Sequence, residues 1–162
     1  MEKNWLNSDF VRTKSFSPRL IEFSTFYKCF LKKLYVRTIK SEYLIAMKMV
    51  SARIYKNDLS DIVGIILAEK GNGYLITWDM IQKAIQDLYG KAEVVSTDIV
   101  RIVKRILLEH NLHILYEFYI ESEKLAKEQM LNLRVINNSI LLDDDFLNFS
   151  EIFIMSLHYE AD

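Results

Sequence analysis

Residues 41–66 of this chain read SEYLIAMKMVSARIYKNDLSDIVGII. The stretch contains two segments whose apolar residues recur at helical spacing, separated by a short polar section around residues 53–58. Ser41 stands where it can cap the first helix, and Asn57 or Asp58 can cap the second. We therefore predict an αα-hairpin. Its inward stripes would be Tyr43, Ala46, Met47, Val50 and Ile54 on the first helix and Leu59, Ile62, Val63 and Ile66 on the second.

Four charged residues lie among these apolar stripes. Lys48 belongs to the first predicted helix, Arg53 to the connection, and Asp58 and Asp61 to the start of the second helix. Asp58 and Asp61 are three residues apart, so they share a face of that helix. The two helices are expected to pack together, so these cations and carboxylates can pair across the hairpin. We favour this structural role, the pairing of the two helices, as the interpretation of the four residues.

The rest of the chain predicts a mostly helical α+β fold. Residues 20–34 fit either a helix or a strand, because their aromatic residues stand at helical spacing but suit a strand. Residues 34–39 alternate and predict a strand. Thr77 and Ser96 can each cap a further helix, and the second would run to about Leu133 because no glycine or proline interrupts it. Residues 135–141 predict a small hairpin, and Ser150 begins a closing helix.

These elements suggest one domain over residues 1–162, a length that supports a single core. A small remnant of sheet is expected in residues 1–40, followed by a helical body over residues 41–133. Residues 134–162 would form a hairpin or loop and the closing helix. Five or six packed helices, including the αα-hairpin, would make up the body.

Composition narrows the class of protein. The formal net charge is −1, which gives no general attraction to nucleic acid, and one cysteine leaves no internal disulfide. Hydrophobic residues make up 51% of the chain, but no run reaches the roughly 18–20 apolar residues that span a bilayer. The first residues do not form a basic start followed by an apolar stretch. We therefore expect a cytoplasmic protein without a membrane segment.

The αα-hairpin resembles the C-terminal part of bacterial nucleotidyltransferase-like proteins of unknown function, which are relatives of abortive-infection and toxin–antitoxin nucleotidyltransferases. Those proteins have a helix of the form E-x-L-x-A-x-K, then an Ala-Arg pair, then [KR]-D-x-x-D-I at the next helix. In this chain Asn57 separates the basic residue from the first aspartate, which departs from the pattern. The similarity covers about residues 5–90. The matching residues are Glu42, Leu44, Ala46, Lys48, Ala52, Arg53, Lys56, Asp58, Asp61 and Ile62, with Trp5-Leu6-Asn7 resembling the link that precedes them.

The resemblance implies nucleotide-binding positions but not a complete enzyme. Lys48, Arg53, Asp58 and Asp61 match positions near the nucleotide, with Lys48 toward its phosphates and Asp58 near the attacking group. The family's catalytic half has a Gly-Ser or Gly-Gly turn beside a D-x-[DE] pair that binds Mg²⁺. All four glycines of this chain lie at residue 64 or later, and no acidic pair spaced i, i+2 precedes Leu34. We therefore assign no catalytic residue, metal ligand or cofactor.

The predicted function is that of a catalytically incomplete nucleotidyltransferase-like protein that acts by binding, as an accessory or antitoxin-like partner. The surface left by the absent half would be apolar, and such surfaces are usually covered. We therefore expect a homodimer or a partner protein, with residues 5–36 in the contact. An alternative is a nucleotidyltransferase whose carboxylates come from a partner chain, with Mg²⁺ and a nucleotide as its cofactors.

A third interpretation is a small helical regulator that binds nucleic acid. Arg101, Lys104 and Arg105 would form a basic face on the helix that begins at Ser96. The balanced net charge argues against it, and a solvated helix face is the simpler interpretation. His110, His113 and His158 do not make a metal site, because no further ligand stands at a suitable spacing. The acidic run at residues 143–145 is expected to be a solvated turn.

Overall fold

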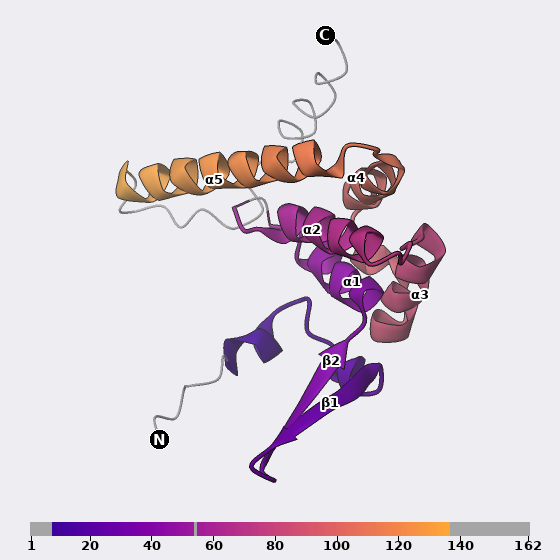
Figure 1. Ribbon diagram of the computed structural model, residues 1–162. Coiled ribbons are helices and arrows are strands. Elements are labelled where there is room, and N and C mark those ends of the chain that lie inside the picture. The colour runs from indigo at the N-terminus through magenta and orange to yellow at the C-terminus, as the bar shows by residue number, and fades with distance from the viewer. Residues whose placement is uncertain (1–7, 54, 137–162) are drawn as a thin grey trace.

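The computed structural model describes residues 8–53 and 55–136 and has a mostly helical α+β fold with a small antiparallel sheet near the N-terminus (Figure 1). This confirms the predicted fold class. In chain order, the elements are the 3-10 helices η1 (Ser8–Arg12) and η2 (Pro18–Ile21), the strands β1 (Ser24–Phe30) and β2 (Leu34–Ile39), and the helices α1 (Ser41–Ser51), α2 (Asp58–Gly71), α3 (Trp78–Tyr89), η3 (Ala92–Val94), α4 (Thr97–Leu108) and α5 (Leu112–Ile136).

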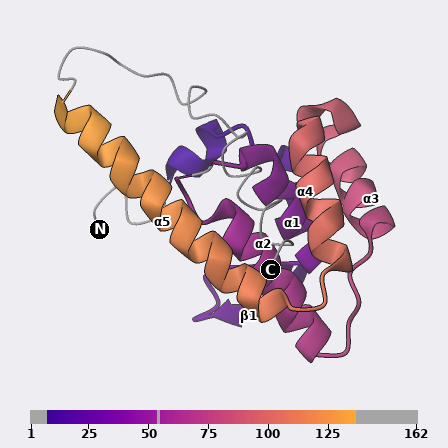
Figure 2. The ribbon, with the colours of Figure 1, turned by 90° about the horizontal axis from the view of Figure 1, so that it is seen from above.

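The core lies among the helices. Helix α1 packs against both α2 and α3, and α5 lies across α2 (Figures 1 and 2). The side chains at the centre are aliphatic, and Ile45, Ile62 and Ile81 are fully buried. Burial of such a side chain stabilises a protein by about 1.5–3 kcal/mol. The helical body therefore holds most of the apolar contacts that stabilise the molecule.

The αα-hairpin forms as predicted, but its first helix is rotated and capped differently. Tyr43 and Ala46 are buried as predicted, and Ile45 and Met49 are buried beside them. The predicted Met47 and Val50 are only partly buried, and Ile54 lies outside the described residues. Ser41 is the first helical residue, and its hydroxyl donates to the Glu69 carboxylate of α2 instead of capping the helix. The predicted stripe on α2 is confirmed, since its four residues are all buried.

Three helix ends follow the signals in the sequence. The Thr77 hydroxyl accepts the Met80 N–H at 3.4 Å, and the Ser96 hydroxyl accepts the Ile99 N–H at the same distance. Both are side-chain N-caps. Gly90 has a φ of 74° and ends α3 in the left-handed conformation that glycine adopts without strain.

The long helix predicted from Ser96 is in fact two helices. Helix α4 ends at Leu108, and Glu109 has extended backbone angles. The Glu109 carboxylate accepts the N–H groups of His110 and Asn111 at 2.8 and 2.9 Å, which stabilises the bend before α5. These bonds lower the pKa of Glu109. The helix is therefore interrupted by the hydrogen bonds of a carboxylate, whereas we predicted an interruption only at a glycine or proline.

Helix α5 reaches Ile136, so Val135 and Ile136 are helical and do not begin the predicted hairpin. The remainder of that hairpin and the closing helix predicted from Ser150 lie outside the described residues. Among the helices that are described, none combines the length and apolarity needed to cross a membrane.

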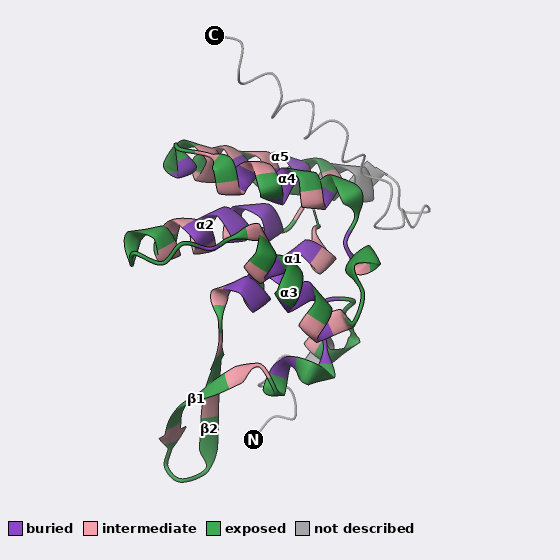
Figure 3. Ribbon diagram, turned by 90° about the vertical axis from the view of Figure 1, so that its right-hand side faces the viewer, coloured by how far each residue is buried: buried purple, intermediate pink, exposed green. Residues whose placement is uncertain are grey.

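Residues 24–39 form an antiparallel β-hairpin that projects from the helical body (Figure 3). Of the residues 20–34 that the sequence left ambiguous, 24–30 form a strand, while 20–21 end η2 and 31–33 form the turn. Leu31 and Lys32 turn the chain with φ of 50° and 54°, and the Lys33 N–H donates to the Phe30 carbonyl at 3.0 Å. Where the hairpin joins the body, Phe23 stacks on Tyr43 of α1 with ring centroids 5.0 Å apart.

Candidate binding surfaces

A cluster of four charged side chains joins α1 to the start of α2. The Lys48 ammonium donates to Asp58 at 3.0 Å and to Asp61 at 2.5 Å. The Arg53 guanidinium donates through Nε to the second Asp58 oxygen at 3.1 Å. The structure therefore brings together all four nucleotide-binding candidates of the sequence, and we call them the charged cluster.

Asp58 is the centre of this cluster. Its side chain is 1% exposed, whereas that of Asp61 is 44% exposed. Asp58 also accepts the backbone N–H of Arg53 at 3.0 Å. This bond forms because Ala52, which follows the last residue of α1, has a φ of 36° that turns the chain back toward α2. One buried carboxylate thus binds both helices and their connection.

The electrostatics of the cluster favour internal pairing. Burial alone would lower the pKa of Lys48, but its hydrogen bonds to Asp61 and Asp58 outweigh this effect, so the pKa is raised. Lys48 therefore stays protonated across the physiological range. Two cations meet two carboxylates, so the cluster has no net charge. A phosphate group would have to compete with Asp58 and Asp61 for either cation.

The charged cluster lies on the wall of an open groove of about 860 Å³. Phe10, Thr13 and Ser15 line it from the N-terminal segment, while α1 and α2 form its floor. Tyr116 of α5 lies on its border. A Cβ added to Gly64 of α2 would stand 3.1 Å from the Tyr116 ring, so glycine permits this close approach. The groove is large enough for a small organic molecule.

Glu123 of α5 is a further polar residue at this end of α2. Asn57 makes no side-chain cap, and Glu123 replaces it by accepting the N–H groups of Leu59 at 2.8 Å and Ser60 at 3.3 Å through one carboxylate oxygen. The other oxygen, Oε2, is buried and accepts no hydrogen bond from the described residues. Burial raises the pKa of Glu123, although the bonds from Ser60 and Leu59 act in the opposite direction.

Sequence reasoning missed Glu123, although α5 carries a weak signal for it. Tyr119 and Ala126 are both buried, and they stand four residues before and three residues after Glu123. A carboxylate at that position must face inward with them. The pattern does not identify the partner, because Leu59 is 64 residues away.

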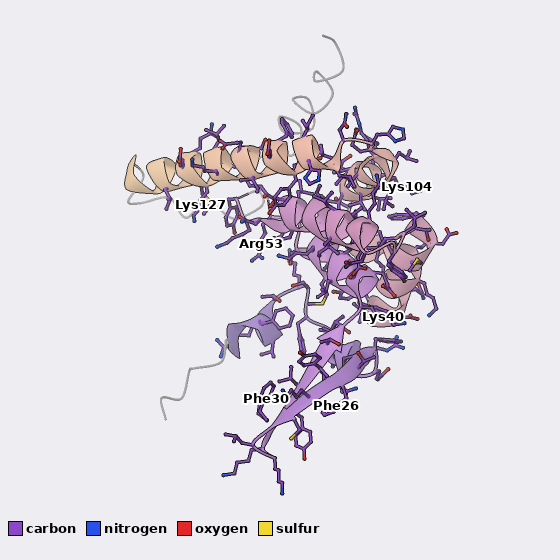
Figure 4. The ribbon with its side chains drawn as sticks, viewed as in Figure 1. Phe26, Phe30, Lys40, Arg53, Lys104 and Lys127 are labelled. Carbon is purple, nitrogen blue, oxygen red and sulfur yellow. The ribbon has the colours of Figure 1, made fainter. Side chains whose placement is uncertain are left out.

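The basic residues of α4 are engaged locally. Arg101 pairs with Asp98 at 3.6 Å, and the Lys104 ammonium stands 4.7 Å from the centre of the Trp78 ring. Figure 4 shows Lys104 on α4, away from the hairpin. Arg105 lies on the same helix and is partly buried. The three basic residues therefore lie on one helix as predicted, but Arg101 and Lys104 already interact with other side chains of the protein.

The β1–β2 hairpin exposes many of its apolar side chains. Its exposed residues come from both strands and the turn, with Leu31 92% and Tyr35 68% exposed. Phe26 and Phe30 stand out from the strands in Figure 4. The sequence prediction placed residues 5–36 in a partner contact for a different reason, the loss of a neighbouring half. The exposed set is Phe26, Tyr27, Phe30, Leu31, Leu34 and Tyr35.

The hairpin is also strongly basic. Residues 24–39 contain Lys28, Lys32, Lys33 and Arg37 and no Asp or Glu, which gives a local charge of +4. The whole chain has a charge of −1, so the other residues together carry −5. Among the described residues, no group of three or more His, Cys, Asp or Glu side chains gathers in a way that could hold a metal ion.

Comparisons with models of protein families, with curated proteins and with solved structures found no match to this chain. The nucleotidyltransferase-like relationship therefore rests on the motif in residues 41–66 and stays a prediction.

Proposed function

We propose that this chain acts by binding a partner protein through its β1–β2 hairpin, as a nucleotidyltransferase-like protein without catalysis of its own. The observation that carries the proposal is the projecting hairpin, whose aromatic and aliphatic side chains are exposed and whose charged side chains are all cations. The register places Phe26 and Tyr35 on one face of the hairpin and Phe30 and Leu34 on the other, so apolar side chains are exposed on both faces. Exposed apolar surface gathered in one element commonly serves binding. The accessory or antitoxin-like role expected from the sequence agrees with such a surface.

The charged cluster supports the part of the proposal that concerns the absence of catalysis. Asp58 is satisfied by Lys48 and by two groups of Arg53. A buried carboxylate that accepts three hydrogen bonds from its own chain has little acceptor capacity left for a ligand. The positions that resemble a nucleotide site instead hold α1 and α2 together.

Purification of the tagged full chain from its native cells tests the proposal. We expect a protein to co-purify in fixed stoichiometry with the wild type. The double variant Lys32→Glu/Lys33→Glu reverses two exposed charges at the hairpin and should lose it. The control Lys91→Glu/Lys127→Glu makes the same change in net charge on exposed residues of the helical body and should keep it. Equal retention by both variants would overturn the proposal.

A second function is favoured by one observation, the position of the charged cluster on the wall of the groove. The groove could take a nucleotide if its phosphates displaced Asp61, the exposed partner, from Lys48. A partner chain would then supply the carboxylates for Mg²⁺. Thermal-shift titration with ATP, GTP, CTP and UTP, each with and without Mg²⁺, tests this function. A metal-dependent rise in Tm that Lys48→Ala abolishes would support it, and no rise would exclude it.

A further inference from the structure

We propose that the free edge of β2 accepts an extended acidic segment of the partner protein as a third strand. This inference rests on the proposed function and specifies the chemistry of the partner. Its starting point is that neither strand packs broadly against any described helix, so the hairpin stands apart from the body (Figures 1 and 3). An isolated two-stranded hairpin is marginally stable in water, and a third strand is the smallest addition that corrects this.

The two edges of the hairpin differ in regularity. The pairing register shifts between Phe26 and Lys28, so the extra residue, Tyr27, belongs to β1. Strand β2 is regular, since each of its residues from Leu34 to Ile39 has a partner. A bulge twists an edge away from further pairing, whereas a regular edge presents evenly placed backbone groups. The partner strand is therefore assigned to β2.

Charge selects the kind of partner. Two hairpins with a charge of +4 each would repel if they paired edge to edge, which disfavours a second copy of this chain. An acidic segment is attracted instead. Lys32 and Lys33 stand at the turn and are exposed, so they can reach carboxylates on a strand beside β2. Arg37 is held by Ser24, to which its guanidinium donates at 2.6 Å, and so it stiffens the hairpin.

The exposed leucines of this surface favour a protein strand, and its exposed aromatic rings make a single-stranded nucleic acid the alternative occupant that the test includes. Single-stranded nucleic acids bind by stacking bases on aromatic rings. Here the Lys28 ammonium stands 5.1 Å from the centre of the Phe30 ring, and the Phe26 and Tyr35 rings contact each other. Leu31 and Leu34 are exposed aliphatic side chains that offer no stacking surface. A strand with alternating acidic and apolar residues would use both the edge and these side chains.

The test uses the full chain with an alternating Glu-Val peptide, a Lys-Val peptide of equal length, and oligothymidylate. Hydrogen exchange is measured at the β2 amides. We expect only the Glu-Val peptide to slow that exchange, by about tenfold at millimolar concentration. The Lys32→Glu/Lys33→Glu variant should weaken this effect about tenfold, and Lys91→Glu/Lys127→Glu should not. A Glu-Val peptide that is N-methylated on both its glutamates and its valines cannot pair on either edge and should have no effect.

Three results would overturn the inference: no protection by the Glu-Val peptide, equal protection by its N-methylated form, or protection by oligothymidylate alone. Failure here and failure of the proposed function are distinguishable. If a protein still co-purifies through the hairpin while the peptide gives no protection, protein binding stands and strand addition falls. If the charge-reversed hairpin also retains the co-purifying protein, the proposed function falls as well.

Discussion

At the scale of single residues, the account depends on the difference between Asp58 and Asp61. Asp58 is buried and accepts three hydrogen bonds from charged or backbone donors, while Asp61 is half-exposed and pairs with Lys48. We expect Asp58→Ala to lower the free energy of unfolding by about 2–3 kcal/mol, because bonds to a buried charge are lost. Asp61→Ala should cost less than about 1 kcal/mol.

Urea denaturation of the two variants measures this difference. The conservative variant Asp58→Asn keeps an acceptor for the Arg53 N–H but removes the charge, so its stability should lie between those of the wild type and Asp58→Ala. Equal losses for Asp58→Ala and Asp61→Ala would show that Asp58 does not hold the αα-hairpin together.

Glu123 gives a prediction for pH dependence. Burial raises its pKa above the ordinary value of 4.5, so the folded state binds the proton more tightly than the unfolded state. Its favourable contribution is complete below that ordinary value and is lost as pH rises through the folded-state pKa. Glu123→Gln keeps an acceptor oxygen for Leu59 and Ser60 without the buried charge. We expect this variant to be more stable than the wild type at pH 7.

The advantage of Glu123→Gln should shrink as pH falls toward 4.5, which denaturation at several pH values would reveal. Glu123→Ala is the control for the cap itself and should cost about 1 kcal/mol at neutral pH. A glutamine variant less stable than the wild type at pH 7 would contradict the assignment.

These residues also show why the site was partly predictable. Lys48, Asp58 and Asp61 lie within one αα-hairpin, where helical spacing alone decides which side chains meet. Glu123 meets the same helix end only because α5 returns over α2. That return depends on the break at Glu109, which is made by side-chain bonds and not by a residue that usually ends helices.

At the scale of elements, the turn of the β-hairpin is strained. Leu31 and Lys32 both have positive φ, which costs non-glycine residues about 1–2 kcal/mol each. Asn-Gly is the favoured pair for such a turn. We expect Leu31→Asn/Lys32→Gly to stabilise the hairpin and to slow hydrogen exchange at its amides, with exchange in α2 unchanged. Faster exchange at the hairpin would contradict the turn geometry.

The hairpin also shows where the spacing of apolar residues is not enough to predict a secondary-structure element. The aromatic residues from Phe23 to Phe30 fit helical spacing as well as a strand, and no glycine marks the turn. Residues 24–30 form a strand because they pair with the alternating segment at residues 34–39. The pattern within residues 24–30 alone contains no information about that pairing. Helices α3 and α4 were predictable because a cap and an apolar stripe agreed in each.

At the scale of the whole molecule, charge is divided between a basic hairpin and a remainder of opposite sign. Repulsion between hairpins leads us to expect that the isolated protein sediments as a monomer at micromolar concentration. This favours the partner protein over the homodimer among the two predicted assemblies. A wild-type dimer at low salt, where repulsion between the hairpins is strongest, would contradict the role given to charge.

The most direct measurement of the central claim is photocrosslinking in native cells from a residue placed at position 31. That position is at the tip of the hairpin and 92% exposed, and position 108, at the end of α4 and 79% exposed, is the matched control. The account predicts one discrete adduct with another protein from position 31 and none from position 108. Equal adducts from both positions, or an adduct with nucleic acid alone, would contradict binding of a partner protein through the hairpin.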